Sequence, residues 1–325
     1  MNALSFRILG RIATWLGVLM FAICMSVASV TNAGDRGTIK IAENDWTGQW
    51  IDINVVKIIL ERELNYDVEL IFADYGGQWE AIANGDLDLT MEIWPDWSLE
   101  QHQEYIVDKK SIEVIGPLGV TAETGWFVPT YVIKGDAERG IEPMAPNLKS
   151  WKQLNDYVDL FKRPESGDKG LCIDGVAAWE TNNEDRIANL GLNYMNVYSG
   201  TEGAMWAEIL GAYERGDPIF ACDMWSPHWV YAKYDFTEIE LPPYTDECNT
   251  TTHACDWKTQ ILYNIARVGF KDEFPDAYQL IANMRLTNAD QESMMFLIDS
   301  EGLSVEESVA QWIDNNKDTW QTWLP

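Results

Sequence analysis

The sequence contains one short element twice, and each copy carries a largely apolar run from a Gly-Asp pair to a tryptophan. The first copy extends from Gly85 to Trp94, and the second extends from Gly216 to Trp225. In both copies an acidic residue stands two positions before the tryptophan, and a proline follows within two positions. Such a run between turn residues predicts a buried strand. The duplication therefore predicts two similar halves, each presenting an indole ring at the end of a strand.

Around the first copy, strands and helices are predicted to alternate. Residues 38–42 alternate like a half-buried strand, and residues 50–66 place apolar side chains at helical spacing. A strand at 68–72, a helix at 78–83 and a strand at 87–93 follow. The order strand, helix, strand, helix, strand predicts a parallel sheet.

The second copy repeats this arrangement. Its predicted elements are a helix at 150–161, a strand at 170–173, a helix at 177–190, a strand at 194–198, a helix at 201–215 and a strand at 219–224. From Trp257 onward we expect helices only, one opening at Pro275, one capped by residues 288–290 and a last one from Ser304 to Trp320.

These elements predict an α/β protein with two Rossmann-like lobes and a ligand cleft between them. We expect residues 34–122 and 240–325 to form the first lobe and residues 123–239 the second, with hinge crossings near 120–132 and 236–243. Ligands of open parallel sheets bind beyond the carboxyl ends of the strands. Trp94 and Trp225 both emerge there.

The first 33 residues read as a secretory signal. Arg7 and Arg11 precede an apolar run over residues 13–30, and small residues lead up to Ala33. An uncleaved membrane anchor is the alternative, because the run is long enough to span a bilayer. Cleavage after the signal predicts an exported protein.

The charge of the exported part restricts its partners. Without residues 1–33 the chain carries 21 Lys and Arg against 52 Asp and Glu, a formal net charge of −31. Such a charge excludes nucleic acid and anionic membrane surfaces as partners. It steers cations toward the protein, although solubility in a salty medium is an equally simple reason for it.

Four cysteines remain in the exported part, and an even number in such a chain favours disulfides. Cys248 and Cys255 bracket a polar, turn-like segment, so their pairing is the simplest connectivity. Cys172 and Cys222 lie in predicted strands and pair only if those strands are neighbours. A zinc site at Cys248, His253 and Cys255 lacks a fourth ligand, so no metal is expected.

Tryptophans at strand ends are the candidate binding residues. The set consists of Trp46, Trp94, Trp97, Trp126, Trp179 and Trp225. A desolvated cation over an indole face gains on the order of 2 kcal/mol, so three or four faces supply about 6 to 8 kcal/mol before entropic costs. Micromolar binding needs about 8 kcal/mol. Glu92 and Asp223 add longer-range attraction. Trp320 and Trp323 are expected to be packing residues.

The chain resembles the substrate-binding proteins of glycine betaine and choline ABC importers, the OpuAC-like family. The resemblance rests on the Trp-Ser-Pro-His-Trp segment at 225–229, the Asn-Gly-Asp-Leu-Asp strand that ends in Trp94, and the Pro-x-Ala helix at 275–284. It implies a type II periplasmic binding protein, a monomer that closes on an osmolyte and hands it to a permease in the inner membrane.

The resemblance also implies a tryptophan cage around a methylated onium group. Betaine-binding relatives often place a histidine four residues after the first cage tryptophan to hold the ligand carboxylate, and here that position is Ser98. His228 or backbone amides are the substitutes. Glycine betaine, choline, trimethylamine N-oxide and dimethylsulfoniopropionate all remain candidate ligands.

Two other functions fit parts of the pattern. Tryptophan platforms also stack on sugars, which makes a periplasmic sugar-binding protein the alternative. A glycosidase using Glu92 and Asp96 meets the demand for paired carboxylates, but both fall where a strand meets a turn. With three histidines, and no serine triad or phosphate loop, we expect neither catalysis nor a cofactor.

Overall fold

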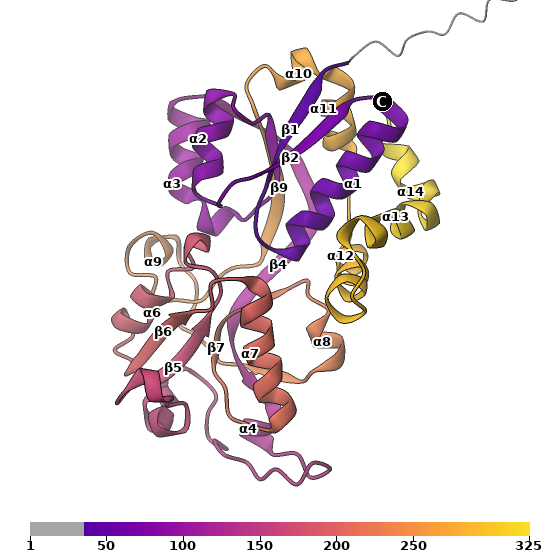
Figure 1. Cartoon of the computed structure of the whole chain (residues 1–325). Coiled ribbons are helices and arrows are strands. Elements are labelled where there is room, and N and C mark those ends of the chain that lie inside the picture. Colours follow the sequence, from indigo (N-terminus) through magenta and orange to yellow (C-terminus); the bar gives the residue numbers. More distant parts are fainter. Residues whose placement is uncertain (1–35) are drawn as a thin grey trace, which may run out of the picture. The chain divides into compact units, whose positions relative to one another are not determined.

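A computed structural model describes residues 36–325 (Figure 1). The predicted signal lies outside the described residues. Nine strands form one mixed sheet in the order β2-β1-β3-β9-β4-β7-β5-β6, and β8 pairs with β4 beside this path. No helix of the described part is both long and apolar enough to cross a membrane.

The first strands follow the predicted order. β1 (Thr38–Glu43) pairs in parallel with β2 (Asp67–Phe72) and β3 (Leu89–Ile93). α1 (Thr47–Leu64) and α2 (Gly77–Asn84) connect them. Figure 1 shows α1 on one side of these strands and α2 on the other, as expected where parallel strands are joined by crossover helices.

Two strands of this region, at Ile112–Pro129 and at Gln260–Arg267, are missing from the sequence prediction. We expected only helices after Trp257, but residues Gln260–Arg267 form β9, antiparallel to β3 and to β4. The start of β9 alternates, with Leu262 buried and Ile261 62% exposed. Two neighbouring strands complete the hydrogen bonds of β9, so tertiary pairing decides its conformation.

Three helices predicted after β9 are present, as α11 (Pro275–Asn283), α12 (Asn288–Met295) and α13 (Val305–Asn315). The last of them is shorter than predicted, because Asn316 leaves the helical conformation and separates α13 from α14 (Lys317–Trp320). The short helix α10 (Phe270–Glu273) was not predicted individually. α11, α12 and α13 pack against α1. The indoles of Trp320 and Trp323 are buried in the adjoining core.

A long strand joins the two parts of the sheet. β4 (Ile112–Pro129) pairs with β9 as far as Ala122, and from Glu123 onward it pairs with β7 and β8. We call β2, β1, β3 and β9, together with β4 as far as Ala122, the first half-sheet. The second half-sheet consists of β4 from Glu123 onward and the strands β5, β6, β7 and β8. The boundaries of the two lobes at 122/123 and 239/240, and the hinge there, remain predictions.

The second half-sheet repeats the parallel arrangement. β5 (Gly170–Asp174) lies between β6 (Tyr194–Tyr198) and β7 (Ala221–Ser226), and α7 (Glu202–Arg215) joins β6 to β7. Thr201 caps α7 by accepting a hydrogen bond from the Ala204 amide at 3.1 Å. The predicted strand, helix, strand order is therefore correct here.

Two helices of this half are shorter than predicted. The expected helix at 177–190 is divided into a 3₁₀ turn at Ala177–Trp179 and α6 (Asn183–Asn189), because Glu180 and Asn182 adopt left-handed backbone conformations. The expected helix at 150–161 consists of α5 (Trp151–Leu154) and a 3₁₀ segment. The remaining helices and strands are α3 (Leu99–Gln101), α4 (Thr130–Lys134), α8 (Val230–Lys233), β8 (Phe236–Glu238) and α9 (Asp246–Thr251).

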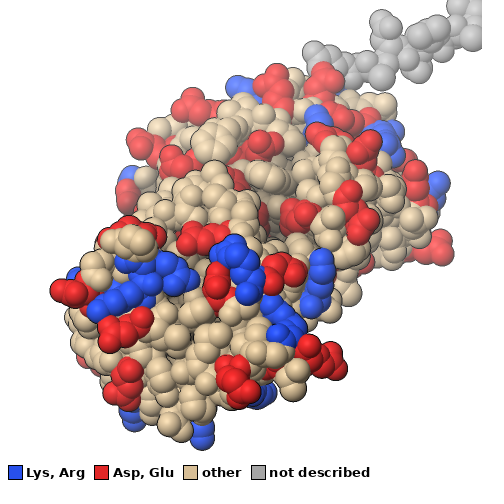
Figure 2. Space-filling view, turned by 60° about the horizontal axis from the view of Figure 1, so that its bottom comes forward, with Lys and Arg blue, Asp and Glu red and all other residues tan. Residues whose placement is uncertain are grey.

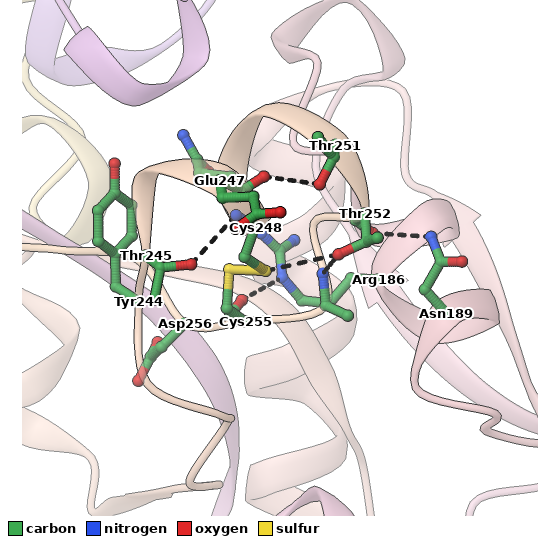
Figure 3. Close-up of a disulfide and its surroundings, with 12 residues drawn as sticks. Arg186, Asn189, Tyr244, Thr245, Glu247, Cys248, Thr251, Thr252, Cys255 and Asp256 are labelled. Carbon is green, nitrogen blue, oxygen red and sulfur yellow. Dashed lines mark hydrogen bonds between the residues drawn. A yellow bond between two sulfur atoms is a disulfide. The ribbon is translucent and has the colours of Figure 1, made fainter.

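Both expected disulfides are present. Cys172 and Cys222 join β5 to β7, which are neighbours, and both side chains are fully buried. Cys248 and Cys255 close the short loop around α9 (Figure 3).

A buried arginine holds the loop of the second disulfide in place. The Arg186 Nε donates to the Cys255 carbonyl at 2.8 Å (Figure 3). Its guanidinium carbon lies 3.7 Å from the ring centroid of Trp257. Burial lowers the pKa of Arg186 to about 9. A buried guanidinium is tolerated because carbonyl groups and an indole face surround it.

We predict that the two disulfides differ in their contributions to stability. A cross-link spanning 50 residues contributes about 4 kcal/mol by the chain-entropy model, and one spanning 7 contributes about 2.5 kcal/mol. Urea denaturation of the Cys172→Ala/Cys222→Ala and Cys248→Ala/Cys255→Ala variants measures both. Equal losses, or a larger loss for Cys248 and Cys255, would contradict the prediction.

Candidate aromatic cage

Five indoles enclose a small cavity between the two half-sheets. The cavity has a volume of about 10 Å³, and its lining residues are Trp46, Trp94, Trp97, Trp179 and Trp225. Trp46 directly precedes α1, while Trp94 and Trp97 follow β3. Trp179 follows β5, and Trp225 lies in β7. Both tryptophans of the duplicated element therefore reach the same cavity.

The rings meet mostly edge to face. The ring centroids of Trp94 and Trp97 are 4.7 Å apart in a stacked arrangement. Trp179 is nearly perpendicular to Trp46, at 6.1 Å, and to Trp225, at 5.5 Å. Edge-to-face contact is a favoured arrangement of aromatic rings, and it sets neighbouring walls at right angles. The result is a box whose walls come from both half-sheets.

A buried glutamate holds two of the walls. The Oε1 atom of Glu92 accepts hydrogen bonds from the Nε1 of Trp46 at 2.7 Å and of Trp94 at 3.2 Å. Its other oxygen accepts one from the Gln291 amide at 3.0 Å. Glu92 has a positive φ of 61°, and the pairing of β3 with β9 shifts register beside it. Such bulges redirect side chains next to binding sites.

Close approach of α1 completes the surroundings of Glu92. A β-carbon at Gly48 would lie 2.9 Å from the Glu92 Oε2, so only glycine admits the carboxylate against this helix. Burial raises the pKa of Glu92 to about 7 and also raises the pKa of the neighbouring Asp52. Loss of hydration outweighs the hydrogen bonds that favour the ionised form.

Two further carboxylates lie beside the cage, Asp45 after β1 of the first half-sheet and Asp223 in β7 of the second. Trp179 donates from Nε1 to the Asp45 carboxylate at 2.6 Å. Asp223 is fully buried, and no side-chain or backbone donor hydrogen-bonds either of its oxygens in the described part of the chain. A β-carbon at Gly175 would lie 2.8 Å from the Asp223 Oδ2 and 2.3 Å from the Trp179 ring. Glycine at 175 therefore lets this carboxylate and the indole lie together.

The electrostatics of the cage favour a cation. All five lining residues are tryptophans, so no basic side chain lines the cavity within residues 36–325. Carboxylates hold the N–H groups of Trp46, Trp94 and Trp179, which leaves the ring faces available. Aromatic faces are negative, and buried carboxylates behind them add to the attraction for a positive charge.

Three predicted site residues lie outside the cavity lining. Trp126 is completely buried in the core of the second half-sheet, where its Nε1 donates to Asn183 at 2.9 Å and its ring packs edge to face on Phe220. We therefore correct its assignment from ligand contact to packing. The strand β4 directs this side chain into the core rather than into the cleft.

Ser98 supports the cage from behind. Its hydroxyl donates to the Trp94 carbonyl at 3.0 Å and lies 2.6 Å from the Tyr75 hydroxyl. The Trp94 amide donates to the same tyrosine oxygen at 3.0 Å, and the Tyr75 ring lies 5.7 Å from that of Trp46. Sequence reasoning missed Tyr75, although it follows β2 at the sheet edge where ligands bind.

His228 also lies behind a wall. It is buried, stacks on Trp206 with centroids 4.3 Å apart and meets Trp225 edge to face at 5.5 Å. These ring contacts orient Trp225, but the imidazole itself does not line the cavity.

Comparisons with known proteins give a consistent result. The sequence profile of OpuAC, described as the substrate-binding domain of an ABC-type glycine betaine transport system, matches residues 37–315. A trimethylamine N-oxide-binding protein of Pelagibacter ubique is 26% identical over 95% of this chain and 98% of its own. A glycine betaine/carnitine transport binding protein of Listeria monocytogenes is 27% identical over 44% of each chain.

Solved structures share the fold. The lactococcal OpuAC in its closed conformation with glycine betaine superposes with a TM-score of 0.68 at 23% identity, covering 89% of this chain and all of the other. An ABC-transporter choline-binding protein with choline gives 0.69 at 18% identity, covering 88% of this chain and 91% of the other. The two-lobed α/β architecture expected from the sequence is confirmed.

We predict that Glu92 makes stability fall with rising pH. Its pKa is about 7 in the folded protein against an ordinary value of 4.5, so the folded state binds the proton more tightly. Stability is greatest below the unfolded pKa and is lost as pH rises through the folded one. The difference amounts to on the order of 3 kcal/mol.

Urea denaturation of Glu92→Gln at pH 5 and pH 8 measures this effect. The variant should lose most of the difference that the wild-type protein shows between the two pH values. Glu63→Gln, at an exposed position of α1, is the matched control and should keep it. An unchanged pH dependence in Glu92→Gln would refute the prediction.

Proposed function

Because the chain belongs to the OpuAC family of substrate-binding domains of ABC-type glycine betaine transport systems, we propose that it captures a small methylated onium compound. The cage of five indoles carries this proposal. Each desolvated face contributes up to about 2 kcal/mol to the binding of a cation without hydrogen-bond donors. The family consists of transport components, not enzymes.

The narrow space between the indoles favours a small ligand. Its volume of about 10 Å³ lies far below the range of about 300–1,000 Å³ typical of sites for drug-sized molecules, so the walls have to move apart to admit even a methylated onium group. Sugar binding, the alternative function, calls for polar side chains around the aromatic platforms. The lining of this cavity consists of tryptophans, and nothing in it favours a sugar.

Among onium compounds, those without a carboxylate fit best. Within the described part of the chain no basic group lines the cavity, and Glu92 and Asp223 lie behind its walls, so a ligand carboxylate would meet repulsion. The relative from Pelagibacter ubique, which aligns over nearly the full length, binds trimethylamine N-oxide by its name. We therefore rank trimethylamine N-oxide and choline above glycine betaine and dimethylsulfoniopropionate.

The place of action follows from the family. Substrate-binding proteins of ABC importers work outside the cytoplasm, and we propose export to the periplasm through residues 1–33. The partner is a membrane permease, and the working form is a monomer. Figure 2 shows acidic side chains scattered over one face among mostly uncharged residues and some Lys and Arg, and the formal net charge of the whole chain is −29.

Calorimetric titration with trimethylamine N-oxide, choline, glycine betaine, dimethylsulfoniopropionate and maltose tests the proposal. We expect micromolar affinity for at least one of the first two and at least tenfold weaker binding of glycine betaine. Binding of maltose alone would overturn the proposed function. Preference for glycine betaine would overturn the ranking only.

Replacing Trp225 by alanine should weaken binding of the preferred onium compound by more than tenfold, because one complete wall of the box is lost. Circular dichroism checks that the variant is folded. The control is Trp151→Ala, which removes a half-buried indole outside the cage. Equal affinity in Trp225→Ala and the wild-type protein would exclude Trp225 from the site.

A further inference from the structure

Carboxylates also connect the two half-sheets outside the cage. Glu202, the first residue of α7, accepts hydrogen bonds from the amide of Thr47 at 2.7 Å and from its hydroxyl at 3.0 Å. Asp299, in the helical turn Phe296–Ser300 after α12, accepts one from the same hydroxyl at 3.1 Å and one from the Trp229 indole at 3.0 Å. We call Thr47, Glu202 and Asp299 the latch.

The latch supplies a cap that α1 lacks. This helix begins at Thr47 without a side-chain cap from its own N-cap residue and without an acidic residue in its first turn. The Glu202 carboxylate, 155 residues away in the sequence, provides the missing acceptor. Because Glu202 also opens α7, one negative charge lies at the positive ends of two helices.

This capping depends on closure of the cleft. Thr47 follows β1 of the first half-sheet, whereas Glu202 follows β6 of the second. Separation of the halves would leave the α1 amide to water and remove the carboxylate from its second helix end. None of the three latch residues lines the cage.

The Thr47 hydroxyl of the latch faces two carboxylate oxygens but has only one proton to donate. The Thr47 hydroxyl has one proton, yet it lies within hydrogen-bond distance of a Glu202 oxygen and an Asp299 oxygen. With both carboxyls ionised, only one of these contacts is a hydrogen bond. With Asp299 protonated, its O–H donates to Thr47, and Thr47 donates to Glu202. The second arrangement makes both contacts of the Thr47 hydroxyl hydrogen bonds.

We propose that this latch holds the closed form of the cleft by taking up a proton, so that residues remote from the ligand determine its affinity. The inference rests on the proposed function, because affinity is its readout. Ligand binding requires the closed form, and apparent affinity scales with the population of that form.

The charged groups around the latch agree with the proposed uptake of a proton. His228 Nε2 lies 3.6 Å from the Glu202 Oε1, and the buried carboxylates of Glu92 and Asp223 interact electrostatically with Glu202. Asp45 lines the same side cavity as the latch, which has a volume of about 460 Å³.

Burial raises the pKa of Asp299 to about 6, and the negative charge of Glu202 is the second cause of this rise. His228 and the hydrogen bonds from Trp229 and Thr47 oppose this rise.

The contact between Asp299 and Glu202 determines whether ligand affinity rises or falls with pH. Opening removes Asp299 from Glu202 and returns its pKa toward the ordinary value of 3.8, so closing takes up a proton between the two values. The latch therefore contributes most to affinity at low pH, and its contribution declines as pH rises through about 6. From pH 7 to pH 5 the gain amounts to about tenfold.

Calorimetric titration with trimethylamine N-oxide and choline at pH 5 and pH 7 tests the latch. Asp299→Asn imitates the protonated acid, since its amide N–H donates to Thr47. Relative to the wild-type protein, its gain in affinity from pH 7 to pH 5 should be about tenfold smaller. Comparison with the wild-type protein cancels the titration of Glu92, which both proteins share.

Glu202→Gln keeps an acceptor for Thr47 but removes the charge at the two helix ends. We expect about fivefold weaker binding at pH 7, within the range for a charge at a helix terminus. Glu214→Gln, at the exposed far end of α7, is the control and should bind as the wild-type protein does. Circular dichroism confirms folding of each variant.

Each outcome distinguishes the two proposals. Wild-type affinity in Glu202→Gln together with a wild-type pH profile in Asp299→Asn would overturn the latch and leave the proposed function standing. A wild-type protein that binds neither onium compound at either pH would overturn the proposed function and the latch with it.

Discussion

The proposed binding site depends on hydrogen bonds from indole N–H groups to buried carboxylates. Glu92 holds Trp46 and Trp94 through one oxygen, and Asp45 holds Trp179. A buried carboxylate is costly unless donors surround it, and here the donors are the cage walls themselves. The same bonds fix the orientation of the ring faces and place negative charge behind them. Rigidity of the cage and its preference for cations therefore have one origin.

This arrangement also explains why the fold needs two halves. Three walls come from the first half-sheet and two from the second, so the box is complete only when the halves meet. The contacts across the cleft repeat the chemistry of the cage, because Trp179 donates to Asp45 and Trp229 donates to Asp299. Acidic residues in this chain thus serve closure as well as solubility. Burial raises the pKa of Asp299, and the proposed latch links closure to protons through this group.

The sequence was most informative where local pattern and tertiary role agree. Trp94 and Trp225 were predictable because each lies at the end of a strand whose pattern is unambiguous, and the topology brings strand ends together. Trp126 was not, because β4 was interpreted as a crossing between lobes and not as a strand, so its alternation was not used to find the buried side. β9 was missed because its hydrogen-bond partners, β3 and β4, are distant in sequence. Glu92 was noticed, but its role depends on a bulge that the sequence does not show.

The central claim is that positive charge, rather than size or shape, selects the ligand. The most direct test compares choline with 3,3-dimethylbutan-1-ol, which replaces the ammonium nitrogen by carbon and keeps the shape. If several indole faces each contribute about 2 kcal/mol to binding a cation, the neutral analogue should bind at least about a hundredfold more weakly. Equal calorimetric affinities for the two compounds would contradict the account, since the cage would then act only as an apolar pocket.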